Sequence, residues 1–204
     1  MTGLNTLEHW GSNMSGAEIW WDSCPTSFPR WRDEFISTNK HTKVKQSLDR
    51  LFNSEQLDGS LLKGVTTNPN LVLSEITANP EFWKALLADY VKASPHASVE
   101  DGFQFLYCEV IKQSAQALLP IWGKSNGKHG WVSAQIDPRL MFDAEAMIQQ
   151  GLQFSQLAPN VMVKVPGTQQ GYQTIEELTA QLISTNGTFS FTCLLYTSPS
   201  PRDA

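Results

Sequence analysis

Residues Val161-Met-Val-Lys-Val165 form a short β-branched run around one lysine, which indicates a strand. Successive side chains of a strand point to opposite faces, so the three valines share one face while Met162 and Lys164 share the other. In a parallel sheet covered by helices, both faces are shielded from water. Lys164 therefore either lies near a strand end, with its ammonium in solvent, or sits in an enclosed pocket. In a pocket, desolvation lowers the lysine pKa and frees the amine to attack a carbonyl carbon.

Strand-like and helix-like segments alternate on both sides of this run. Short runs predict strands at residues 18–22, 62–67, 131–136, 161–165 and 185–191. Apolar residues at helical spacing predict helices at about 44–52, 80–90, 98–118, 141–157 and 172–182. Short strands joined by such helices predict βα units and a parallel sheet. The pattern fits a barrel or an open doubly wound sheet, and periodicity does not choose between them.

Two helix starts carry local signals. Asn79-Pro80 combines an Asn cap with Pro at the first helical position. Ser98, followed three residues later by Asp101, approximates a capping box. We expect the helix that begins there to end near Leu118, because Pro120 lies just beyond.

Composition excludes several classes of function. The net charge is −5 and the 15 Lys and Arg are scattered, which disfavours a nucleic-acid or anionic-membrane surface. No apolar run approaches the roughly 20 residues of a membrane helix. The N-terminus lacks a secretory signal, and the three widely spaced cysteines indicate neither a disulfide framework nor a zinc site. We therefore expect a cytoplasmic protein with no metal, no nucleic-acid partner and no membrane partner.

The chain is long enough for one substantial core. We expect an N-terminal extension at residues 1–16, a partial barrel at 17–192 and a non-native tail at 193–204. In the tail, helical periodicity stops and two prolines occur within three residues, as in a translated sequencing adapter. An ordinary disordered terminus is the alternative reading.

Each predicted strand carries polar side chains on one alternating face. They are Asp22, Thr66 and Asn68, Ser133 and Gln135, Lys164, and Asn186 and Thr188. Alone, each has an ordinary explanation: Asp22 can stabilise the turn before Pro25, and Asn68 before Pro69 is a common turn. In a closed barrel the whole set can converge on one polyol-sized pocket, which favours catalysis.

Together, several of these segments resemble successive motifs of the transaldolases, in the family's order and at compatible spacing. The motifs are Gly64-Val-Thr-Thr-Asn-Pro69, Val132-Ser-Ala-Gln-Ile-Asp-Pro-Arg-Leu140, Val161-Met-Val-Lys-Val-Pro166 and Asn186-x-Thr188. The resemblance implies a (β/α)8 TIM barrel of the class I aldolase type, here truncated after about five strands. It also implies transfer of a dihydroxyacetone unit between sugar phosphates of the pentose phosphate pathway. The resemblance further implies that a lysine Schiff base carries that transfer without a cofactor.

The resemblance assigns roles residue by residue. Lys164 corresponds to the Schiff-base lysine, and Asp22 to the acid/base that handles the substrate hydroxyl. The other matches are Asn68 and Asn186, which hold hydroxyls, Thr66 and Ser133, which line the pocket, and Thr188, which positions the catalytic water. The implied partners are a ketose donor and an aldose acceptor, and a homo-oligomer is compatible with the sequence.

Gln135 departs from the pattern, because transaldolases usually have a glutamate there that shuttles protons through the water. An amide holds a water but does not exchange a proton near neutral pH. Fructose-6-phosphate aldolases, which are close relatives, have glutamine at this position. The alternatives are therefore an aldolase-like lyase and a non-catalytic sugar-binding homologue.

The chain ends before the strands that carry the family's phosphate-binding Ser and Arg. Five strands cannot close an eight-stranded barrel, and an open edge exposes backbone groups and apolar surface. We therefore also expect that the 204 residues alone can behave as an inactive, aggregation-prone fragment.

Overall fold

The computed structural model describes residues 6, 18–39, 42–52 and 60–190. Within them, one parallel sheet runs in the order β1-β2-β3-β4-β5. The strands are β1 (Ile19–Asp22), β2 (Leu62–Thr66), β3 (Trp131–Gln135), β4 (Val161–Pro166) and β5 (Thr185–Thr188). A doubly wound sheet reverses its strand order, whereas a barrel adds each new strand beside the last. The consecutive order therefore confirms the partial (β/α) barrel over the open sheet.

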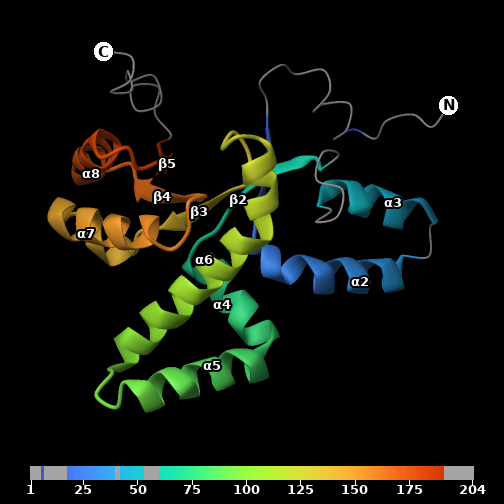
Figure 1. Ribbon diagram of the computed structural model, residues 1–204, viewed down its shortest axis with the longest axis horizontal. Helices are drawn as coiled ribbons and strands as arrows, with labels where there is room; N and C mark the ends of the chain where they lie inside the picture. Colours follow the sequence, from blue (N-terminus) through green and yellow to red (C-terminus); the bar gives the residue numbers. More distant parts are fainter. Residues whose placement is uncertain (1–5, 7–17, 40–41, 53–59, 191–204) are drawn as a thin grey trace.

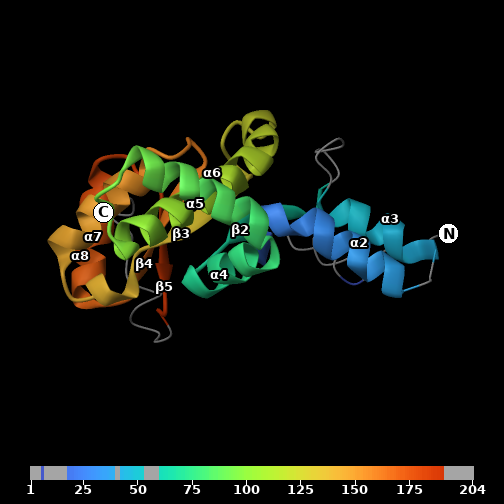
Figure 2. The ribbon, with the colours of Figure 1, turned by 90° about the horizontal axis from the view of Figure 1, so that it is seen from below.

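Helices connect the strands, and the last three helices of the chain pack on the sheet (Figure 1). The helices are α2 (Phe28–Thr38), α3 (Thr42–Leu51), α4 (Pro69–Ala78), α5 (Pro80–Ala93), α6 (Val99–Lys124), α7 (Ala144–Ser155) and α8 (Gln169–Ala180). Figures 1 and 2 both show α7 and α8 beside β4 and β5, while α2 and α3 extend away past the opposite end of the sheet. Among the described residues, no helix has the length and apolar character that a membrane crossing requires.

The hydrophobic core lies between the outer face of the sheet and α6, α7 and α8. The valines of β4 belong to this face, since Val161, Val163 and Val165 are buried. They pack in one cluster with residues such as Val110 of α6 and Met147 of α7. Burying one such side chain stabilises the fold by about 1.5–3 kcal/mol. The alternating pattern therefore leaves the Lys164 face of β4 turned toward the inside of the partial barrel.

The predicted capping box at the start of α6 is confirmed. The Ser98 hydroxyl accepts from Asp101 N at 3.1 Å, and the Asp101 carboxylate accepts from Ser98 N at 2.8 Å. The predicted end of this helix is wrong, because α6 continues through Pro120 to Lys124. Pro120 is exposed, and Ile121 beyond it is buried, so packing maintains the helix at the loss of one backbone bond.

Three further predictions concern the start of α5, the length of the fifth strand and the two ends of the chain. Helix α5 begins at Pro80 as predicted, although Asn79 makes no side-chain cap bond. The fifth strand is shorter than predicted and ends at Thr188. The N-terminal extension at 1–16, apart from residue 6, and the tail at 193–204 lie outside the described residues.

Candidate active site

Strand register brings the predicted polar residues onto the inner face of the sheet. Lys164 pairs with Gln135 on one side and with Asn186 on the other. Residues in register on neighbouring parallel strands project to the same face, so these three side chains form one row. A second row follows β1, β2 and β3, where Thr66 pairs with both Asp22 and Ser133. The two rows adjoin because Ser133 and Gln135 are two residues apart on β3.

Lys164 is the middle residue of the first row and is half-buried. Its amine donates to the Thr66 hydroxyl, with Nζ–Oγ1 at 3.0 Å, and to the Thr67 carbonyl at 3.4 Å. Burial lowers the pKa of Lys164, and the negative charge of Asp22 partly opposes that shift. A lowered pKa increases the fraction of neutral amine, which is the nucleophilic form.

A cavity of about 410 Å³ opens over the amine. Its lining residues are Asp22, Asn68, Pro69, Asn70, Gln135, Pro138, Lys164, Thr188 and Phe189. Its volume lies within the range of roughly 300–1,000 Å³ that is common for small-molecule sites. The cavity thus brings together residues from all five strands or the segments that follow them, including Asp22 and Lys164.

Asn68 has a structural role as well as a place in the cavity wall. It follows β2 and is the N-cap of α4, where its Oδ1 accepts from Leu71 N at 3.0 Å. A cap of this kind contributes about 1 kcal/mol to helix stability. Because the oxygen is engaged, the amide nitrogen of Asn68 is the group that can donate to a ligand in the cavity.

Three predicted site residues do not line the cavity: Thr66, Ser133 and Asn186. Thr66 accepts the hydrogen bond from Lys164. Ser133 is fully buried, and its hydroxyl accepts from Asn186 Nδ2 at 3.0 Å. Ser133 therefore orients Asn186, whose carbonyl oxygen is left as the acceptor for a ligand.

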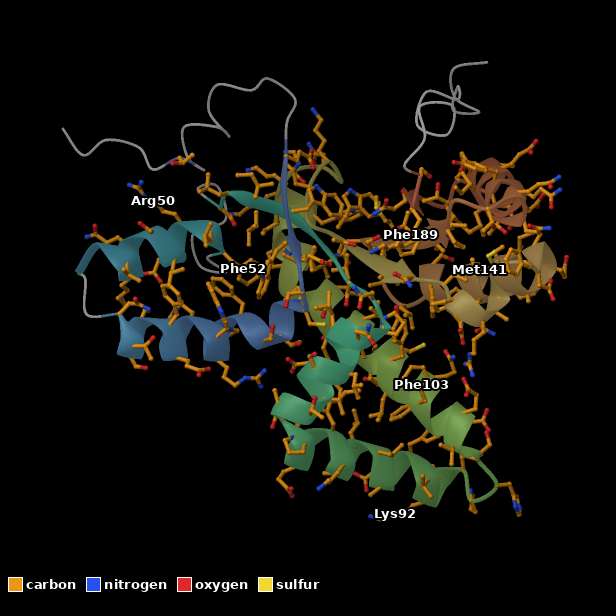
Figure 3. All side chains as sticks on the ribbon, turned by 180° about the vertical axis from the view of Figure 1, so that it is seen from behind. Arg50, Phe52, Lys92, Phe103, Met141 and Phe189 are labelled. Carbon is orange, nitrogen blue, oxygen red and sulfur yellow. The ribbon has the colours of Figure 1, made fainter. Side chains whose placement is uncertain are left out.

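Sequence analysis did not single out four residues that shape the cavity region. Asn70 lies in the first turn of α4, which follows β2, Pro138 begins a short 3-10 helix (Pro138–Leu140) that follows β3, and Phe189 directly follows β5. Phe189 has a left-handed backbone (φ 63) and is exposed; Figure 3 labels it at the end of β5. Tyr107 of α6 bonds to the backbone of Gln135. Only the position of Asn70, Pro138 and Phe189 within a few residues of a strand end could have indicated their role.

No group of three or more His, Cys, Asp or Glu side chains in the described part of the chain is arranged to hold a metal ion. Among the residues that line the cavity, Asp22 has the acidic side chain and Lys164 has the basic one. The arrangement offers a nucleophilic amine, a carboxylate that can take a proton, and amide and hydroxyl groups for a polyol.

Comparison with known proteins identifies the relatives of this chain. The family model for transaldolase/fructose-6-phosphate aldolase matches residues 46–197. The transaldolase of Thiobacillus denitrificans is 31% identical over 166 residues, covering 76% of this chain and 45% of the relative. Transaldolase 1 of Streptomyces avermitilis is 34% identical over 135 residues, which cover 65% of this chain and 35% of the relative. The transaldolase of Mycobacterium bovis is 30% identical over 144 residues, which cover 70% of this chain and 38% of the relative. The chain spans less than half the length of these relatives.

Proposed function

Since the chain belongs to the transaldolase/fructose-6-phosphate aldolase family, we propose that the protein carrying it transfers dihydroxyacetone from a ketose phosphate to an aldose phosphate. One observation supports this proposal most strongly. Lys164, whose pKa is lowered by burial, shares a cavity with the carboxylate of Asp22. A neutral amine beside a carboxylate is the pair that carbon–carbon cleavage through an iminium requires.

The first steps form the covalent intermediate. The neutral amine of Lys164 attacks the C2 carbonyl carbon of the ketose, and a carbon–nitrogen bond forms. Loss of water then gives the iminium, which withdraws electrons from C3. The iminium is the electron sink of the reaction, so this chemistry requires neither a metal nor an organic cofactor.

Cleavage follows from the position of Asp22. Its carboxylate takes the proton of the C4 hydroxyl as the C3–C4 bond breaks. The bonding electrons move to the iminium, giving the enamine on Lys164, and the shortened aldose leaves. The enamine then adds to the carbonyl carbon of the acceptor aldose, which takes up a proton, and water finally releases the new ketose from the lysine.

The remaining residues hold the substrate and the water. We assign the amide nitrogen of Asn68 and the amide oxygen of Asn186 to the substrate hydroxyls. Thr188 and Gln135, which both line the cavity, hold the water that enters and leaves the carbinolamine. Thr66 and Ser133 keep Lys164 and Asn186 in place.

Gln135 supports a second candidate function. Gln135 lines the cavity, and a carboxylate at this position would exchange protons with the water, which a carboxamide does not do. With an amide there, release of free dihydroxyacetone competes with transfer, as in a fructose-6-phosphate aldolase-like lyase.

The acceptor requirement distinguishes the two functions. The full-length protein is incubated with fructose 6-phosphate, with and without erythrose 4-phosphate, and sedoheptulose 7-phosphate and free dihydroxyacetone are both quantified. A transferase turns over only when the acceptor is present, whereas a lyase releases dihydroxyacetone without it. No product in either condition would rule out both.

The biological setting is part of the same proposal. We assign the reaction to the pentose phosphate pathway of the cytoplasm, with residues 17–192 forming part of the barrel that carries the site. Sugar phosphates are the proposed partners, and assembly of several copies is compatible with the reaction.

A further inference from the structure

The end of β3 has no strand partner on its β2 side. Pairing with β2 ends at Thr66 and Ser133, and Thr67 N makes the last bond to the Ser133 carbonyl at 3.2 Å. Beyond that point the chain turns into α4. Gln135 lies two residues further along β3, and its own N–H and C=O point toward the side where β2 has ended. Both groups are buried and need partners.

The hydroxyl of Tyr107 supplies both partners. It accepts from Gln135 N at 3.0 Å and donates to the Gln135 carbonyl at 3.0 Å. A phenolic hydroxyl can donate once and accept at the same time, so one side chain replaces two bonds of the absent strand. Burial raises the pKa of Tyr107 well above its ordinary value, which keeps the hydroxyl protonated.

The ring of Tyr107 is itself held in place. It comes from α6, is 3% exposed and packs against Phe154 with ring centroids 5.7 Å apart and against Phe103 at 6.2 Å. Phe103 is labelled on α6 in Figure 3. These rings line a second cavity of about 390 Å³. Gln135 lines both this cavity and the cavity over Lys164.

We propose that Tyr107 is a positioning residue, which fixes the backbone of Gln135 and thereby aims its carboxamide at the water beside Lys164. The role in catalysis rests on the proposed function, whereas the link between Tyr107 and Gln135 does not. A purely structural role, tying α6 to β3, is the competing explanation.

Tyr107→Phe removes both hydrogen bonds and keeps the ring. We expect the partition between transfer and release of dihydroxyacetone to change by about tenfold or more, because small displacements of a catalytic group have large effects on rate. The KM for fructose 6-phosphate should stay within about twofold, since the substrate-holding amides are untouched. Gln135 N–H exchange with solvent should become at least about tenfold faster, because its acceptor is lost.

Two control variants separate this effect from a loss of stability. Leu118→Ala creates a cavity at a fully buried residue of the same helix, eleven positions beyond Tyr107, and leaves the Tyr107 hydroxyl in place. Tyr90→Phe deletes a hydroxyl from a ring that stacks on Phe105. Neither control should change the partition, and neither should selectively accelerate the exchange of Gln135 N–H.

A double-mutant cycle gives the decisive comparison. In a Gln135→Ala background, Tyr107→Phe should leave the partition unchanged if it acts through the carboxamide. An equal change in both backgrounds, or the same change in Leu118→Ala, would overturn the proposal. A wild-type protein without turnover would instead overturn the proposed function. Even then, an unchanged rate of Gln135 N–H exchange in Tyr107→Phe would disprove that Tyr107 fixes the backbone of Gln135.

Discussion

The amine of Lys164 donates a hydrogen bond to the hydroxyl of Thr66, a residue 98 positions earlier in the chain, with Nζ–Oγ1 at 3.0 Å. The two strands that carry these residues are not neighbours, since β3 lies between them. The bond therefore crosses the inside of the curved sheet. It holds the amine over the cavity that Asp22 and Gln135 also line.

The pH dependence of covalent bond formation should report the lowered pKa of Lys164. Only the neutral amine attacks the carbonyl, so the rate of adduct formation rises as pH increases through that pKa. Because burial lowers the pKa, the inflection should lie below the ordinary lysine range. Rapid-quench borohydride trapping across a pH series measures it. An inflection at the value of a solvent-exposed lysine would show that burial does not tune this amine.

Asp22→Asn should stop the reaction after the Schiff base has formed. Without the carboxylate, the C4 hydroxyl keeps its proton, and kcat should fall by roughly 10²- to 10⁴-fold. Mass spectrometry of trapped protein should then find the intact ketose on Lys164 rather than the three-carbon unit. The inflection should also move further down, because the Asp22 charge raises the pKa of Lys164. Asp89→Asn, on the exposed face of α5, is the matched control.

Gln135→Glu should raise transfer relative to release of free dihydroxyacetone. A carboxylate at this position can exchange protons with the water, which the amide cannot do. The ratio of sedoheptulose 7-phosphate to dihydroxyacetone is measured at saturating acceptor. If the ratio does not rise, Gln135 does not govern the partition.

Gly64→Ala should destabilise the fold by about 1–3 kcal/mol, because the added methyl would overlap a packed ring. A Cβ at Gly64 would lie 2.7 Å from the ring of Trp20, its register partner on β1. Gly123→Ala is the matched control: nothing lies within 4 Å of its Cβ, and we expect a gain of up to about 1 kcal/mol. Urea denaturation of the full-length protein compares them. Equal unfolding free energies would contradict the close contact between β1 and β2.

The two-sided character of β4 could be predicted from sequence, because alternation is a local property of a strand. The order of the strands could not, since it depends on which segments meet in space. That order, with the register of Lys164 between Gln135 and Asn186, is what selects the barrel arrangement. The same reason explains why the bond between Ser133 and Asn186, 53 positions apart, was not foreseen.

Helix α4 was missed for a local reason. Asn68-Pro69 is a common turn signal, but it is also an N-cap followed by Pro at the first helical position. The structure shows the second use, since Asn68 caps α4 directly after β2. Helix α2 was missed although Phe28, Trp31 and Phe35 follow helical spacing and Pro29 lies in the first turn; of these three aromatic residues, only Phe28 is buried.

Borohydride trapping with fructose 6-phosphate, followed by peptide mapping of the full-length protein, tests the central claim most directly. We predict a reduced dihydroxyacetone adduct on the peptide that contains Lys164, and its loss in Lys164→Met. Lys63, which lies on β2 and whose amine donates to the Ser60 carbonyl, should remain unmodified. A folded, full-length protein that gives no adduct, or gives it on another lysine, would contradict the assignment of Lys164 as the Schiff-base residue.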